Sequence, residues 1–132
     1  MTASWLDDAV SQFGRNMGLP SLASDASGVV QLELQAGGVL AIEAAQGGAG
    51  TDVLVCLGRP LGFSGGRAVR KALESVHCAS GHMLDIRVAV RGEGPQALLF
   101  GIVNVPQREF TAHTLERVVD YLRRWIEEAR HG

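Results

Sequence analysis

The sequence predicts a single α+β domain of element order α-β-β-β-α-β-β-α, a twisted antiparallel sheet with three helices. Apolar residues recur at three- and four-residue steps in three segments, which is typical of amphipathic helices. Between these segments, apolar and polar residues alternate, and glycines or prolines separate consecutive strands. A chain of 132 residues can bury a substantial core, so we assign residues 1–132 to one domain.

The first 44 residues predict a helix followed by a hairpin. The helix covers about residues 5–17, and Gly18 followed by Pro20 ends it. Alternation in residues 29–34 predicts a half-buried strand, which two glycines join to a second strand over residues 39–44. The apolar stripe of the helix consists of Leu6, Ala9, Val10, Phe13 and Met17.

The middle of the chain predicts a central strand, a basic helix and a second hairpin. Residues 52–58 predict a third strand, in which residues 53–57 are apolar on both faces, and this favours a central strand that is covered on two sides. Arg59 and Pro60 are expected to end this strand, because proline cannot donate to the ladder. A helical stripe over residues 68–76 follows, and its basic start opposes the helix dipole, so we expect an acidic neighbour. Residues 84–90 and 97–105 then predict the last two strands.

The last helix has the clearest signals in the sequence. Thr111 is a good N-cap, and Phe110 before it can pack on Leu115 as a hydrophobic staple. Charged residues occupy most of the opposite side of the helix. The apolar stripe consists of Leu115, Val118, Val119, Leu122, Trp125 and Ile126.

Composition argues against several classes of partner and location. The net charge of -2 and the pI near 6.0 give no basic field for nucleic acid. No apolar run approaches the ~20 residues that span a bilayer, and no signal peptide is recognisable. The two cysteines, Cys56 and Cys78, do not form a disulfide framework. We therefore expect a cytoplasmic protein with free thiols and without membrane insertion.

Two local groups could carry chemistry, and neither matches a known signature. Cys78 lies between His77 and His82, but zinc usually takes four ligands, and thiol catalysis needs an oriented histidine. The glycine-rich turn over residues 62–67 could hold an anion on backbone amides, yet it lacks the Gly-Lys-Ser/Thr end of a phosphate loop. We therefore expect no enzymatic activity, no metal and no cofactor.

The predicted apolar surface exceeds what one protomer covers. Three amphipathic helices on one sheet leave a sheet face or a helix exposed unless another chain packs there. A second copy or a client protein could provide that cover. We expect a homodimer, because closed two-fold dimers are the commonest assemblies of soluble proteins.

The sequence also resembles a known family, the class I type III secretion chaperones of the Tir chaperone (CesT) type. The resemblance rests on Phe13 with the segment MGLP at 17–20, the hairpin at 29–43, the apolar segment at 52–57, and Trp125 in the closing helix. It extends over nearly the whole chain in element order and length. The chain departs from the family in being only mildly acidic and in having a basic start to its second helix.

The resemblance implies a cytoplasmic homodimer that binds the N-terminal region of a secreted effector. Such a chaperone keeps the segment extended, soluble and export-competent without hydrolysing ATP. Carried over by position, the candidate effector-binding residues are Leu6, Val10, Phe13, Leu32, Leu34 and Ile42. The second helix is implied at the dimer interface, through Val69, Leu73 and Val76.

Two other interpretations of the sequence stay open at this point. A roadblock-like or profilin-like dimeric module in a scaffold or regulatory complex would share most of these patterns. An enzyme that uses Cys78 with His77 or His82 is the third interpretation.

Overall fold

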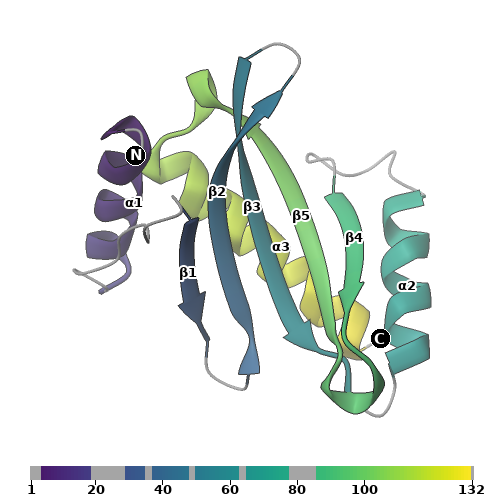
Figure 1. Cartoon of the computed structure of the whole chain (residues 1–132). Helices are drawn as coiled ribbons and strands as arrows, with labels where there is room; N and C mark the ends of the chain where they lie inside the picture. The colour runs from purple at the N-terminus through teal and green to yellow at the C-terminus, as the bar shows by residue number, and fades with distance from the viewer. Residues whose placement is uncertain are drawn as a thin grey trace.

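The computed structural model describes residues 4–18, 29–34, 37–47, 50–62, 65–77 and 86–131. Within these ranges the chain forms one five-stranded antiparallel sheet, in the spatial order β1-β2-β3-β5-β4, together with three α-helices (Figure 1). This architecture confirms the predicted α+β class and the order of the elements.

The element boundaries lie close to those predicted. The helices are α1 (Ser4–Asn16), α2 (Gly65–His77) and α3 (Ala112–His131), and two 3-10 turns are η4 (Gly94–Gln96) and η5 (Gln107–Glu109). The strands are β1 (Val29–Glu33), β2 (Val39–Gly47), β3 (Gly50–Pro60), β4 (Ile86–Arg91) and β5 (Leu98–Pro106).

The third strand continues past its predicted end at residue 58 and includes Pro60. The Leu61 N–H donates to the Ala97 carbonyl at 2.8 Å, and hydrogen-bonded pairs alternate with non-hydrogen-bonded pairs in antiparallel strands. Pro60, which pairs with Leu98, therefore sits at a position that needs no N–H toward β5. For this reason the missing donor of proline does not interrupt the ladder there.

The core lies between the sheet and the helices. Helix α3 runs diagonally behind the strands, α1 packs at the β1 side, and α2 packs beside β4 (Figure 1). Alternate residues of each strand point to this helix-covered face, and those of the central strand β3, Val53, Val55 and Leu57, are at most 3 % exposed. The helices contribute Leu6, Val10, Phe13, Ala68, Ala72, Leu115, Val118, Leu122, Trp125 and Ile126.

The opposite face of the sheet has no helix over it among the described residues (Figure 1). On β3, Leu54 and Cys56 point to this face and are only half-buried. The prediction that the third strand is central is therefore confirmed, whereas the second cover that we expected for it is not provided by the described part of the protomer. We call this surface the open sheet face.

Helix α3 approaches β5 closely at Gly101. A Cβ atom at this position would lie 2.5 Å from Cζ3 of Trp125 and 3.0 Å from a methyl carbon of Leu122. The absence of a side chain therefore lets the Trp125 ring, which is 5 % exposed, pack closely against the strand. Glycine is required here by packing rather than by backbone conformation.

The helix ends carry the caps that the sequence predicts. The Thr114 N–H donates to Oγ1 of Thr111 at 3.1 Å, which caps the first turn of α3. Phe110, just before this cap, is buried and meets Trp5 of α1 edge-on, with ring centroids 6.0 Å apart. Helix α1 ends at a turn in which Gly18 has φ of 79°. No helix among the described residues combines the length and apolar character that a membrane crossing requires.

Candidate functional site

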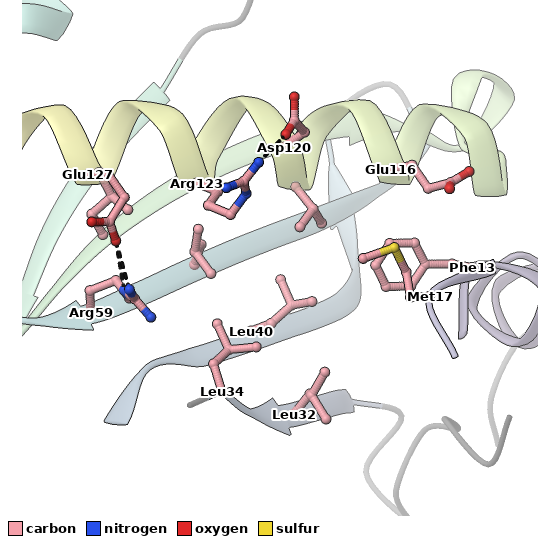
Figure 2. A pocket seen from close by; sticks show the side chains of 13 residues that line it. Phe13, Met17, Leu32, Leu34, Leu40, Arg59, Glu116, Asp120, Arg123 and Glu127 are labelled. Atoms are coloured by element: carbon pink, nitrogen blue, oxygen red, sulfur yellow. Dashed lines mark hydrogen bonds and ion pairs between the residues drawn. The ribbon is translucent and has the colours of Figure 1, made fainter. Parts of the chain in front are cut away.

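An apolar groove opens on the helix-covered face, at the corner where α1 and α3 leave β1 and β2 partly uncovered. It has a cavity volume of about 770 Å³ and draws its walls from three strands and two helices (Figure 2). It is lined by Phe13, Met17, Leu32, Leu34, Leu40, Leu57, Arg59, Glu116, Val119, Asp120, Arg123, Ile126 and Glu127. We call it the α1–α3 groove.

The floor of the groove consists of leucines from three adjacent strands. Leu32 of β1 lies opposite Leu40 of β2, and Leu40 lies opposite Leu57 of β3, so the three side chains form one row across the sheet. Leu40 and Leu57 are buried, whereas Leu32 is half-buried because β1 has a neighbouring strand on one side only among the described residues. The exposed part of the floor is therefore nearest the β1 edge.

Helix α1 closes one end of the groove with Phe13 and Met17 (Figure 2). Phe13 is buried in the core and presents only 2 % of its surface, whereas Met17 is 54 % exposed. A methionine side chain is unbranched and adapts its shape to different apolar partners. Met17 is therefore suited to cover bound apolar side chains of differing size.

The rim along α3 is charged. Both Nε and Nη2 of Arg59 donate to Oε1 of Glu127, at 3.1 Å and 2.8 Å, and these two side chains are 22 % and 30 % exposed. This pair joins β3 to α3 at the end of the groove away from α1 (Figure 2). At the α1 end, Nδ2 of Asn16 donates to Glu116 at 3.3 Å. The charged rim thus frames an apolar floor, which is typical of protein-binding surfaces.

Asp120 is a carboxylate on the rim of the groove, and two arginines stabilise its ionised form. Nη2 of Arg123 lies 2.7 Å from Oδ1 and Nη2 of Arg124 lies 2.9 Å from Oδ2. The hydrogen bond from Arg123, with the charges of both arginines, holds the pKa of Asp120 below its ordinary value. Asp120 therefore stays ionised at and well below neutral pH, and its two arginines keep it from repelling an acidic ligand.

Beside the groove, β1 is an edge strand of the described sheet. The Leu34 N–H donates to the Gly38 carbonyl at 2.8 Å, so positions 34, 32 and 30 point their main-chain groups at β2. The alternate residues Gln31 and Glu33 then direct their N–H and C=O groups away from β2. An added strand could pair with these groups while its alternate side chains entered the groove.

The structure divides the six predicted effector-binding residues into two groups. Leu6, Val10 and Ile42 are 0 % exposed and belong to the core, so in this conformation they have no surface to offer. Their periodicity placed them on the apolar side of their elements, and that side faces the sheet or the helices of the same chain. Phe13, Leu32 and Leu34 do line the groove, and the candidate set narrows to them.

The sequence reasoning missed the contribution of α3 and β3 to this site. The sequence pattern identifies Val119 and Ile126 only as part of a helical stripe, and it predicts Arg59 at the end of a strand. It places Met17 on the α1 stripe and not on a binding surface. Its position directly before the helix stop at Gly18 was the available signal, because a last-turn apolar residue often lies beyond the core that its helix covers.

The predicted dimer residues lie on α2, away from the groove. Leu73 is 49 % exposed, and Val69 is half-buried against the core. The side chain of Val76 lies outside the described residues. Val90 on the neighbouring strand β4 is also 46 % exposed, so two large apolar side chains reach solvent at this end of the molecule.

The chemical groups considered in the sequence lie largely outside the described residues. Cys78 and His82 are not described, and neither is the side chain of His77. The glycine-rich turn is described at Gly62 and from Gly65 onward. Among the residues whose placement is known, no three His, Cys, Asp or Glu side chains gather into a metal-binding group.

Comparison with known proteins assigns the chain to a family. The model of the type III secretory system chaperone SycN matches residues 5–130, which is almost the entire sequence. No curated protein matches the sequence. Among solved structures, a chain from the structure of the HopA1-SchA chaperone-effector complex superposes with a TM-score of 0.63 at 15 % identity, covering 97 % of this chain and 94 % of that one.

That structural match shows a shared fold, and it agrees with the match to the family model. The family model extends from α1 to α3 and so takes in all the described helices and strands. The chain is a type III secretion chaperone of the SycN family.

Proposed function

We propose that this chain is a cytoplasmic bacterial chaperone that binds the N-terminal region of a type III secreted effector, without ATP hydrolysis and without a cofactor. The α1–α3 groove beside the β1 edge is the observation that carries the proposal. A solved relative of the same fold was studied as a chaperone-effector complex, which agrees with an effector partner here. The bound segment stays extended and competent for export.

The proposed binding mode follows from the direction of the β1 main chain. An effector strand pairs with the outward N–H and C=O groups of Gln31 and Glu33. Its alternate side chains, those beside Leu32 and Leu34, point into the groove and are apolar. The side chains between them lie next to Gln31 and Glu33 on the other face and are polar or basic.

Binding in this mode needs no chemical step, because burial of apolar surface and main-chain pairing supply the free energy. Burying apolar surface contributes about 25 cal/mol per Å², whereas ordering a disordered segment costs several kcal/mol. The groove alone accommodates only a few side chains, so a stable complex also needs main-chain pairing and contacts beyond the groove. The effector therefore wraps a longer stretch of the chaperone than the groove spans.

We propose further that the chain is related to the Tir chaperone (CesT) type within these chaperones. The supporting pattern is Phe13 followed by the helix stop after Met17, together with Trp125 in the closing helix. In the structure, Phe13 and Met17 form the α1 end of the groove, which gives this pattern a physical role.

A titration tests the proposal. The full chain is titrated by calorimetry with N-terminal segments of candidate effectors from the same secretion system, in buffer without nucleotide. We expect one segment to bind with micromolar or tighter affinity and with a negative heat-capacity change, because apolar surface is buried. Added ATP and magnesium should leave the affinity unchanged, and a requirement for nucleotide would contradict the proposal.

We also propose a homodimer in which α2 contacts its copy through Val69, Leu73 and Val76. Leu73→Glu is expected to convert the α2-linked dimer to a smaller species, because it places an unpaired carboxylate in an apolar contact. Light scattering coupled to size-exclusion chromatography measures the change. Gln12→Glu adds the same charge at an exposed position of α1 and should leave the mass as it is. An unchanged mass for Leu73→Glu would reject the α2 contact.

A further inference from the structure

The rim of the α1–α3 groove carries a carboxylate that its own arginines do not neutralise. Three of the lining residues are acidic and two are arginines. Glu127 pairs with Arg59 and Asp120 pairs with Arg123, which leaves Glu116. Glu116 is half-buried at the end of the groove next to α1, and it forms no ion pair among the described residues.

Helix α1 holds Glu116 through a short chain of side-chain hydrogen bonds. Nη2 of Arg15 donates to Gln12 at 2.7 Å, and Nε2 of Gln12 donates to Oδ1 of Asn16 at 2.9 Å. Because its oxygen accepts from Gln12, Asn16 turns its amide nitrogen to Oε2 of Glu116, at 3.3 Å. Within the described part of the chain, Oε1 of Glu116 has no donor. The carboxylate is thus positioned and keeps an acceptor for a ligand.

Exposed apolar surface lies at the same end of the groove as this carboxylate. Met17 is exposed, and Val119, on the turn of α3 next to Glu116, is half-buried and lines the groove. Figure 2 shows Glu116 with Met17 and Phe13 at one end, and the pair of Arg59 and Glu127 at the other. Lysine and arginine suit such a place, because their methylene stems pack on apolar atoms while their charged ends stay at the rim.

The strand register relates this end of the groove to a bound strand. Leu34 lies opposite Gly38, where a Cβ atom would lie 2.9 Å from Cδ of Arg59, so Leu34 marks the Arg59 end. Leu32 lies closer to α1 (Figure 2). In the proposed binding mode, apolar side chains lie beside these two leucines. The next side chain on the same face, two residues further toward α1, reaches the end with Glu116, and the intervening ones point to the open sheet face.

We propose that Glu116 is a specificity-determining residue that selects effector segments with a lysine or arginine two residues beyond an apolar pair, at the α1 end of the groove. This inference rests on the proposed effector-binding function and names the chemistry of the segment that fits. The basic side chain donates to Glu116 in a partly desolvated place, where a charge-assisted hydrogen bond is stronger than a neutral one. An acidic side chain there is rejected, because it would place two carboxylates together.

A display selection tests this preference with a defined probe. The probe is a phage library of random segments of about twelve residues, twice the length of a usual strand, selected on the full chain. We expect the enriched segments to share two apolar residues separated by one other residue. Lysine or arginine should be enriched two residues beyond this pair, always at the same end, and aspartate and glutamate should be depleted there.

Two charge variants of α3 assign the preference to one position. Selection on Glu116→Lys should keep the apolar pair and replace the basic preference with an acidic one. Glu128→Lys makes the same change of charge on the same helix, at an exposed position that does not line the groove. This control should keep the basic preference of the original chain.

Synthetic segments give the size of the effect. An enriched segment is made with lysine and with glutamine at the selected position, and both are titrated by fluorescence anisotropy. On the original chain, the lysine segment should bind about five-fold more tightly than the glutamine segment, as a partly exposed ion pair allows. On Glu116→Gln, which keeps a side chain of the same shape, the two affinities should differ by less than about two-fold.

The possible failures are distinguishable. Enrichment of the apolar pair without a basic residue at a constant distance would overturn the role of Glu116 and leave the groove as the effector site. A basic preference that survives in Glu116→Lys would do the same. Its loss in Glu128→Lys would show that overall charge, and not pairing at the groove, selects basic segments. If no segment with alternate apolar residues is enriched at all, the proposed function itself is contradicted.

Discussion

Leu32→Asp is expected to weaken effector binding by more than about 100-fold while the protein keeps its fold. Leu32 is half-buried at the open part of the groove floor, so the free protein tolerates a polar atom there better than a core position would. In the complex, an apolar effector side chain would cover the carboxylate. Losing one apolar contact and burying an unpaired charge together cost at least about 3 kcal/mol, which is more than a 100-fold loss of affinity.

The neighbouring residue supplies a matched control for this variant. Gln31 lies on the same strand, is exposed, and points its side chain to the opposite face of the sheet. Gln31→Asp introduces the same residue with the same poor strand propensity, so it should lower the free energy of unfolding by a similar amount. The affinity for the effector should stay within a few-fold of that of the original protein. Equal losses of affinity in both variants would mean that the groove does not hold the effector.

Gly101→Ala is expected to destabilise the fold by overpacking the contact between β5 and α3. The new Cβ would lie 2.5 Å from Trp125 and 3.0 Å from Leu122, and both of these side chains are buried. Relief of this overlap requires α3 to move away from β5 or the indole to leave its position. We expect a loss of about 1–3 kcal/mol in the free energy of unfolding, measured by urea denaturation.

The same substitution at Gly66 separates packing from the intrinsic effect of replacing glycine. A Cβ at Gly66 would meet no atom within 4 Å, and the residue is exposed in the first turn of α2. Gly66→Ala should be neutral or stabilise by up to about 1 kcal/mol, because alanine favours the helix. A Gly101→Ala protein as stable as the original would show that α3 does not lie against β5 at this distance.

The fold followed from the sequence because its signals are local. Periods of 3.6 and 2 identified the helices and strands, and the Thr111 cap and the Gly18 stop placed helix ends within a residue or two. The central position of the third strand also followed, since a strand that is apolar on both faces is costly at an edge. The prediction that the third strand ends before Pro60 is wrong, because a proline disrupts a strand only where its missing N–H would have donated to a neighbouring strand.

The candidate site could be predicted only in part from the sequence. A periodic pattern identifies the apolar side of a helix or strand, but it does not show which other element covers that side. Leu6 and Val10 of α1 and Leu32 of β1 all lie on the apolar sides of their elements, yet the first two are fully buried and Leu32 is only half-buried. The angle at which α3 crosses the sheet decides this difference, and that angle depends on contacts such as Trp125 on Gly101. No local signal in the sequence specifies it.

The central claim is that an extended effector segment pairs with the β1 edge beside the α1–α3 groove. The most direct measurement is residue-resolved amide hydrogen exchange of the chaperone, free and saturated with an effector segment. The outward amides of Gln31 and Glu33 should exchange rapidly in the free protein and at least about ten-fold more slowly in the complex, since each then donates to the effector main chain. Unchanged exchange at these two amides in a saturated complex would contradict the account.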